Sequence, residues 1–202
     1  MTEWEKLTNG QIYNDMDEEL FQRRIEAKKL FRAYNKTEDT DTDMRNNLLQ
    51  KLFEHVGEEV WIEPDFRCEY GKNITIGDNV YINFGCIILD CAEVIIGNQV
   101  LMGPNIGIYP VNHAIDAEER IKGACFGKSV IIGNRVWLGG DVKILSGVTI
   151  GDDTIIGTGS IVTKNIPSGV IAAGNPCRVI RKITADVKTD YGNERKRLEN
   201  EL

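Results

Sequence analysis

The stretch that decides the fold is IGNRVWLGGDVKILSGVTIGDDTIIGTGSIVTKNIP, residues 132–167. It divides into blocks of six residues, and every block begins with Ile, Leu or Val. The fifth position of each block holds a small or β-branched residue. Two inward positions in every six, separated by turn residues, indicate a coil of three short strands and three turns. Such coils contain eighteen residues and stack at about 4.8 Å.

The same pattern extends toward the N-terminus. Further blocks cover residues 76–93 and 96–113, and an earlier coil is predicted over 62–73, with Ile62, Phe66 and Cys68 facing inward. An ordinary sheet does not fit, because its strands alternate with period two between hairpin turns. The predicted fold is therefore a mainly β, hexapeptide-repeat solenoid. The fifth positions expected to face inward are Val80, Cys86, Ala92, Val100, Ile106, Val136, Val142, Val148, Thr154 and Ser160.

The chain changes character near residue 57. Apolar residues recur at helical spacing from Asp17 to Tyr34 and again from Met44 to Val56, with Asp17 as an N-cap and Gly57 as a stop. We expect a helical segment over 1–57, the solenoid over 58–183 and a tail over 184–202. A loop over 114–131 interrupts the repeat. Such excursions are often functional, although solenoids also tolerate passive insertions.

Composition narrows the classes of function. The 202 residues carry a formal net charge of −7, which disfavours nucleic-acid binding. The apolar runs are too short to cross a membrane, and the acidic N-terminus lacks the apolar core of a secretion signal. A cytoplasmic location is expected. The five cysteines are odd in number and have no CxxC spacing, which predicts free thiols.

Histidine is scarce. His55 lies in a predicted helix and is interpreted as structural, whereas His113 lies where the scaffold meets the loop. A lone surface histidine is more often plain polar surface than catalytic, and its position is what favours a role. Two histidines cannot supply the three that a γ-type carbonic anhydrase zinc site needs, so no metal is expected. Sparse outward threonines argue against an ice-binding solenoid.

Two further features suggest binding. Basic residues gather near Gly174-Asn175-Pro176 and form a candidate site for phosphates, or else a solvated cap. Trp137 is expected to point outward, toward a ligand, a neighbouring subunit or the loop. The basic residues of this group are Lys164, Arg178, Arg181 and Lys182.

The chain resembles the maltose/galactoside O-acetyltransferases, a family of hexapeptide-repeat acyltransferases, from about residue 3 to about 183. The segments that carry the resemblance are YND (13–15), FRCEYG (66–71), YINFG (81–85), GPN (103–105), His113, VWLGG (136–140), GVTIGDDTIIGTGSIVTKNIP (147–167) and GNPCRVIRKI (174–183). The details are most similar to the maltose branch. The resemblance implies a left-handed parallel β-helix and a homotrimer with active sites between subunits, where two prisms and a loop form a cleft.

The resemblance also implies roles for individual residues. His113 matches the general base that takes a proton from a sugar hydroxyl as its oxygen attacks acetyl-CoA, and Asn83 matches the donor that stabilises the oxyanion. Acceptor contacts are implied for Asp15, Arg24, Glu69, Tyr81 and Cys91. Contacts with acetyl-CoA are implied for Trp137, Gly140, Thr158, Thr163, Lys164, Arg178 and Arg181.

This sequence departs from the family at the acceptor. Glu69 stands where relatives carry Asp or Ser, and Cys91 stands where galactoside relatives carry Asp, although the neighbouring Asp90 is retained. Cys125 and Phe126 of the loop are expected to border the acceptor, and a catalytic cysteine is not expected. The acceptor is therefore a sugar such as maltose, glucose or a galactoside, or another small molecule such as an amino sugar, an antibiotic or a lipo-oligosaccharide. A remaining hypothesis is that the protein is a non-catalytic scaffold that keeps the family fold.

Overall fold

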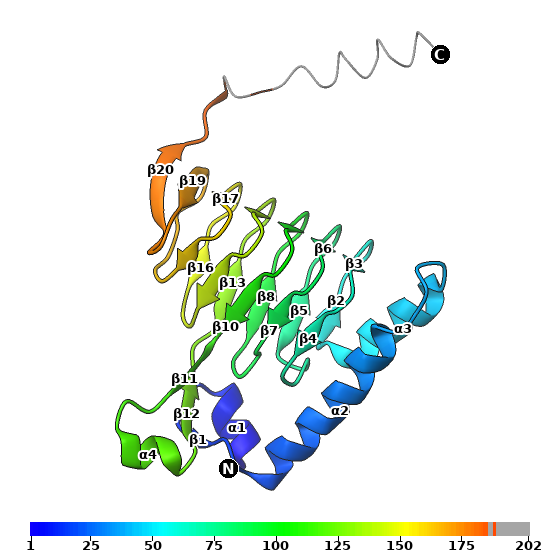
Figure 1. The fold of residues 1–202 in the computed structure, drawn as a ribbon, viewed down its shortest axis with the longest axis vertical. Helices are drawn as coiled ribbons and strands as arrows, with labels where there is room; N and C mark the ends of the chain where they lie inside the picture. The colour runs from blue at the N-terminus through cyan, green and yellow to red at the C-terminus, as the bar shows by residue number, and fades with distance from the viewer. Residues whose placement is uncertain (186–187, 189–202) are drawn as a thin grey trace.

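The computed structural model describes residues 1–185 and 188, and the predicted tail lies mostly outside these residues. The chain forms a parallel β-solenoid whose N-terminal end is covered by helices (Figure 1). The helices are α1 (Glu3–Thr8), α2 (Glu18–Tyr34), α3 (Thr42–Leu52) and α4 (Ala117–Ile121). Within the described residues, no helix combines the length and the apolar character that crossing a membrane requires.

Three sheets form the faces of the prism. Face 1 contains β2 (His55–Val56), β5 (Ile74–Ile76), β8 (Val94–Ile96), β13 (Val130–Ile132) and β16 (Thr149–Ile150). Face 2 contains β3 (Trp61–Ile62), β6 (Tyr81–Ile82), β9 (Leu101–Met102), β14 (Trp137–Leu138), β17 (Ile155–Ile156), β19 (Val170–Ala173) and the antiparallel β20 (Arg178–Lys182). Face 3 contains β4 (Arg67–Cys68), β7 (Ile87–Ile88), β10 (Gly107–Tyr109), β15 (Lys143–Leu145) and β18 (Ile161–Val162).

The predicted inward positions form the core. All of the fifth-position residues named above are buried, as are Ile62, Phe66 and Cys68 of the earlier coil. The Asp17 side chain accepts hydrogen bonds from the first turn of α2, as an N-cap does. The second predicted helix is shorter than expected, because α3 ends at Leu52 and His55–Val56 pair with β5 as the first strand of the solenoid. The helical interpretation of His55 was therefore wrong.

Ile-Gly dipeptides at residues 76–77, 96–97, 132–133 and 150–151 mark the corner between faces 1 and 2. There the side chain of an Asn or Asp in each coil accepts a hydrogen bond from the backbone of the coil before it, as in Asp78 N to Asn98 Oδ1 at 2.8 Å and Asn98 N to Asn134 Oδ1 at 2.9 Å. A Cβ on Gly77 would collide with Asn98 Oδ1. Glycine is required there because the next coil occupies that space.

The loop between faces 3 and 1 folds into an arm. β11 (Val111–His113) pairs antiparallel with β12 (Ala124–Gly127), and β12 pairs on its other edge with β1 (Tyr13–Asn14). The arm projects beside α1 and carries α4 at its tip (Figure 1). The N-terminal segment is thereby joined to the middle of the chain by a three-stranded sheet.

Asp90 holds the turn that follows β4. Its carboxylate is fully buried and accepts hydrogen bonds from the backbone N–H groups of Glu69 (2.9 Å), Tyr70 (2.8 Å) and Asn73 (3.3 Å). Burial raises the pKa of Asp90 to about 6, and these hydrogen bonds oppose the rise. Because the folded-state pKa lies above the ordinary value, the titration of this carboxyl favours the folded state more at pH 4 than above pH 6. Asp90 therefore faces the core.

Replacing Asp90 with alanine should lower the free energy of unfolding by about 3 kcal/mol, because it leaves three backbone donors without this acceptor. Urea denaturation at pH 7 measures the change. Asp78→Ala is the matched control, since Asp78 is exposed and accepts from Glu58 N. An equal loss in the two variants would contradict this role of Asp90.

Candidate active site

His113 ends β11, and its exposed side chain lies directly across from Cys125 of β12. The Cys125 Sγ is 3.0 Å from His113 Nδ1. The imidazole is therefore anchored on its Nδ1 side, and the other ring nitrogen, Nε2, is left for a substrate. The sequence placed Cys125 near the acceptor but did not reveal this contact. An antiparallel pairing of the segments around 112 and 126 would have been needed to find it.

The thiols of Cys125 and Cys91 stay protonated at neutral pH. Burial raises the pKa of Cys125 to about 11, with the Asp15 carboxylate adding to the effect. Burial raises the pKa of Cys91 as well, and Glu69 adds to that rise. A thiol is a poor nucleophile compared with a thiolate, so neither cysteine is poised for covalent catalysis.

The N-terminal segment brings acidic and basic side chains to the same arm. β1 places Tyr13 opposite Cys125, and Asp15 N donates to Gly123 O at 2.8 Å. Gly123 has a φ of 89°, and a Cβ there would collide with the Asn14 side chain. A glycine is thus needed for the segment to pack closely against the arm.

Arg24 on α2 connects the predicted acceptor residues. Its guanidinium forms ion pairs with Asp15 and with Glu69, the latter with Nε 2.6 Å from Oε1. It also lies over the Tyr70 ring at 5.4 Å from the centroid. Burial opposes the charge on Arg24, but Tyr70, Asp15 and Glu69 outweigh it and raise the Arg24 pKa. We call Asp15, Arg24, Glu69 and Cys91 the acceptor cluster.

Two buried hydroxyls border the acceptor cluster. Tyr13 lies against Cys91 and Cys125, and Tyr70 belongs to the same small core cluster. Neither hydroxyl has a hydrogen-bond partner among the described residues. Buried hydroxyls normally find a partner, so each of these two retains unused hydrogen-bonding capacity. Both tyrosines lie in segments that carry the family resemblance, but the resemblance implied no site role for either of them.

Asn83 and Tyr81 lie elsewhere on the chain. Tyr81 is on β6 of face 2, where its hydroxyl contacts Glu63 Oε1 at 3.0 Å, and Asn83 follows at the corner between faces 2 and 3. His113, by contrast, is on the arm that leaves the corner between faces 3 and 1. The Asn83 Oδ1 accepts from Phe84 N at 2.8 Å, while its amide N–H groups donate to no described residue.

Gly140 and Thr158 occupy the same corner as Asn83. The corner is a ladder of turns, linked by hydrogen bonds from Asn105 N to Phe84 O, Asp141 N to Pro104 O and Gly159 N to Gly140 O, at 2.8–2.9 Å. The backbone N–H groups of Gly140 and Thr158 donate to no acceptor in the described part of the chain. They form a line of free donors along the solenoid.

The remaining predicted cofactor residues lie toward the C-terminal end. Trp137 is 53% exposed on face 2, and its register row continues through Ile155 and Ile171 to Arg181 on β20. Arg178, at the other end of β20, is exposed as well. Thr163 and Lys164 follow β18 at the next corner and are exposed. The basic group thus lies on the last coils, at the opposite end from the helices (Figure 1).

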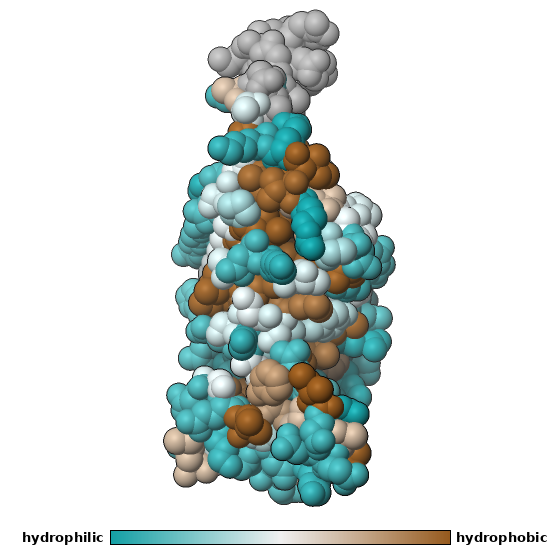
Figure 2. All heavy atoms as spheres, turned by 90° about the vertical axis from the view of Figure 1, so that its left-hand side faces the viewer, coloured by the Kyte–Doolittle hydropathy of each residue, from teal (hydrophilic) through white to brown (hydrophobic). Residues whose placement is uncertain are grey.

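Apolar side chains also reach the surface. Figure 2 shows brown patches near the C-terminal hairpin and near the arm. The exposed apolar residues of these two regions are Ile115, Ile121, Val179 and Ile180. On face 2, one outward row runs through Trp61, Tyr81, Leu101 and Trp137. Surfaces of this kind mark contacts with other molecules or subunits.

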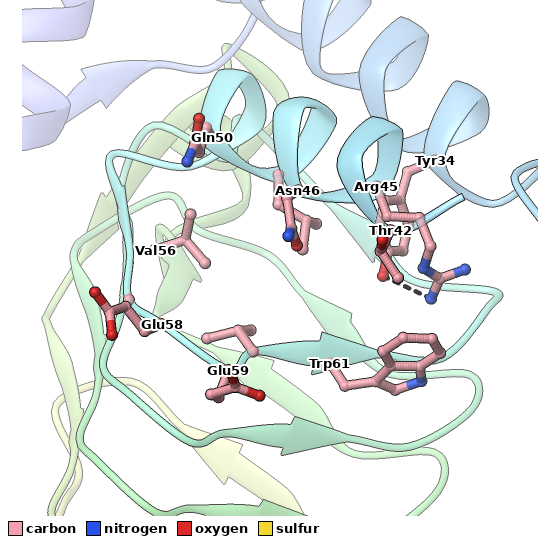
Figure 3. Close-up of a pocket in the computed structure, with 12 residues that line it drawn as sticks. Tyr34, Thr42, Arg45, Asn46, Gln50, Val56, Glu58, Glu59 and Trp61 are labelled. Carbon is pink, nitrogen blue, oxygen red and sulfur yellow. Dashed lines mark hydrogen bonds between the residues drawn. The ribbon is translucent and has the colours of Figure 1, made fainter. Parts of the chain in front are cut away.

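A separate cavity of about 540 Å³ lies between α3 and the first coil (Figure 3). Arg45, a charged residue that lines this cavity, is 2% exposed. Its guanidinium donates hydrogen bonds to the Tyr34 hydroxyl at 2.9 Å and to Ile62 O at 2.8 Å. The guanidinium also lies between the Tyr34 and Trp61 rings, 4.7 and 4.5 Å from their centroids. These contacts fasten the helical cap to the solenoid.

The described residues contain no cluster of three or more His, Cys, Asp or Glu side chains that could hold a metal ion. His113 thus lies beside the Cys125 thiol, and the ion-paired side chains of the acceptor cluster border the same arm.

Comparison with known proteins agrees with this architecture. Residues 6–57 match the family model described as the maltose acetyltransferase hexapeptide capping motif, and residues 129–164 match that of the bacterial transferase hexapeptide repeats. The chain is 42% identical to the galactoside O-acetyltransferase of Escherichia coli over 93% of this chain and 92% of that protein. It is 38% identical to the galactoside O-acetyltransferase of Lactococcus lactis over 95% and 94%.

Solved structures agree as well. A maltose O-acetyltransferase from Clostridium difficile superposes with a TM-score of 0.89 at 46% identity, covering 91% of this chain and 98% of that one. A galactoside acetyltransferase in complex with coenzyme A gives 0.87 at 39% identity, covering 94% and 97%. With this similarity along nearly its whole length, the chain belongs to the maltose/galactoside O-acetyltransferase family of hexapeptide-repeat acyltransferases.

Proposed function

We propose that this enzyme transfers the acetyl group of acetyl-CoA to a hydroxyl of a sugar, with His113 as the general base. The observation that carries the proposal is the exposed imidazole, anchored by Cys125 beside partly exposed charged side chains and two buried hydroxyls. Such a cluster fits a small polar acceptor, because the partly exposed Asp15 and Glu69 carboxylates can accept hydrogen bonds from its hydroxyl groups.

The chemistry follows from the ring nitrogen that faces the substrate. The sugar hydroxyl oxygen attacks the thioester carbonyl carbon while its proton passes to His113 Nε2. The negative charge that develops on the carbonyl oxygen is stabilised by the free Asn83 amide N–H. The carbon–sulfur bond then breaks, the CoA thiolate takes the proton back from the imidazolium, and the products are a sugar acetate and free CoA. No acyl-enzyme is formed.

Acetyl-CoA fits the corner between faces 2 and 3. The free backbone donors at Gly140 and Thr158 suit the amides of the pantetheine arm, and Trp137 offers an apolar surface beside them. The cations Lys164, Arg178 and Arg181 suit the phosphates, since Arg binds them in a bidentate manner. Relatives solved with CoA or acetyl-CoA support this co-substrate.

We further propose that the active site forms between subunits of a homotrimer. His113 and Asn83 project from different corners of one prism, and the described chain records no contact between them. A neighbouring copy can bring its Asn83 corner to the His113 arm, and the exposed apolar row on face 2 offers a surface for association. Residues 1–57 supply the acceptor side of the site. The free thiols of the described chain agree with a cytoplasmic location.

His113→Ala should reduce turnover by at least about 10²-fold, because it removes the proton acceptor for the attacking hydroxyl. The assay follows acetyl-CoA-dependent release of free CoA with a panel of sugars, small alcohols and amines, with an enzyme blank for its own cysteines. His55→Ala is the matched control. Near-normal turnover of the His113 variant would remove it as the base, and release only with amines would replace the acceptor class.

Arg178→Ala combined with Arg181→Ala should raise the KM for acetyl-CoA by about tenfold and leave the KM for the sugar nearly unchanged, since two charge-assisted contacts are lost. Initial rates at varied acetyl-CoA and fixed sugar give both constants. An unchanged KM for acetyl-CoA would show that the phosphates bind elsewhere.

Mixing subunits tests the shared site. His113→Ala and Asn83→Ala chains, each inactive alone, should recover up to about a quarter of wild-type activity when unfolded together and refolded at equal amounts, because one interface in four pairs an intact His113 with an intact Asn83. The refolded single variants are the controls. No recovery, in material that sediments as a trimer, would mean that both residues act within one chain.

A further inference from the structure

A groove lies beside the acceptor cluster, between α2 and face 3. It has a volume of about 540 Å³ and an apolar floor. The floor is formed by Phe31, Cys68, Ile87 and Leu89. Basic side chains surround it, three from α2 and the turn that follows and one from β4. These are Lys28, Arg32, Lys36 and Arg67. We call this the basic groove.

The cations of the basic groove have no partners among the described residues. None of them forms an ion pair or a side-chain hydrogen bond within residues 1–185. Other cations on the same helix are paired, Arg23 with Glu19 at 2.8 Å and Lys29 with Glu26 at 2.6 Å. Placing Lys28 and Arg32 one helical turn apart without a counter-charge is unfavourable. A protein of net charge −7 has no general excess of cations to explain the cluster.

Two carboxylates also line the basic groove, and they do not neutralise it. Glu69 is held by Arg24, with which it forms the 2.6 Å ion pair, and Asp65 is exposed and forms no ion pair with another described residue. Glu69 belongs to both the basic groove and the acceptor cluster. A ligand in the groove therefore also borders the acceptor cluster.

The groove is separate from the cations assigned to acetyl-CoA. Arg178 and Arg181 lie on β20, at the end of the solenoid away from the helices, whereas the basic groove lies between α2 and the first coils (Figure 1). One acetyl-CoA molecule already has its phosphate contacts at the β20 end. The basic groove is thus available to the other substrate.

We propose that the acceptor is an anionic saccharide, whose phosphate or carboxylate group binds in the basic groove while a hydroxyl of the same molecule reaches His113. This inference rests on the proposed function and adds the charge of the acceptor to it. The anion gains charge-assisted hydrogen bonds from Arg32 and Arg67, and the sugar ring packs on the apolar floor. The two ends of the acceptor are then fixed on either side of Glu69.

The test compares matched neutral and anionic acceptors in the CoA-release assay. The pairs are glucose with glucose 1-phosphate and glucose 6-phosphate, galactose with galacturonate, and lactose with lactobionate. The anionic member of at least one pair should show a kcat/KM about tenfold higher than its neutral partner, and added NaCl should reduce that preference. Arg32→Gln combined with Arg67→Gln should remove about tenfold of the preference.

Lys29→Gln combined with Lys51→Gln is the control, since it removes two positive charges outside the basic groove and should keep the preference. Circular dichroism verifies that both double variants fold. Neutral acceptors that match or exceed every anionic partner would overturn the proposal. So would an anionic preference that survives the Arg32 and Arg67 changes. Absence of His113-dependent release with every sugar would instead contradict the proposed function, and this inference with it.

Discussion

The close stacking of one coil on the next is the constraint on which the molecule depends. At the corner between faces 1 and 2, the backbone of Gly77 leaves no space for a side chain because Asn98 of the following coil fills it. Each coil is held by its neighbours, so the first coil needs a cover. Arg45 supplies part of that cover by joining α3 to the first coil through Tyr34, Trp61 and Ile62 O. The helices therefore cap the first coil of the solenoid, as a stacked repeat fold requires.

A regular prism with flat faces offers little concavity, and chemistry enters where the regularity is interrupted. The arm places His113 across from Cys125, and the N-terminal strand adds to the same sheet, bringing Asp15 to Arg24. Three segments far apart in the chain therefore meet at one place. The corner with Asn83 and the backbone N–H groups of Gly140 and Thr158 is built separately, by uninterrupted coils, and lies apart from the arm in one copy of the chain.

The hexapeptide period predicted the core because it records directly which side chains face inward, and Thr154 and Ser160 are buried at the expected positions. The helical spacing, by contrast, misled at the end of α3, because Phe53 and Val56 continue the apolar spacing of the helix although Val56 already belongs to a strand. Other features depend on distant pairing. Contact between Cys125 and His113 needs the hairpin register, and the basic groove needs the position of α2 on face 3. Neither is encoded in local periodicity, and Asp15, Arg24 and Glu69 were identified only through the family resemblance.

The stacked coils also act as a ruler. The arm leaves the solenoid after β10, and β20 lies against β19, which follows the two complete coils β13–β15 and β16–β18. Because coils repeat at about 4.8 Å, the span between the imidazole and the terminal arginines can change only in steps of about 4.8 Å, one step for each coil. Deleting or inserting eighteen residues between the arm and β20 changes that span by one step without changing either end. The number of coils in this stretch therefore fixes the distance between the arm and the C-terminal hairpin.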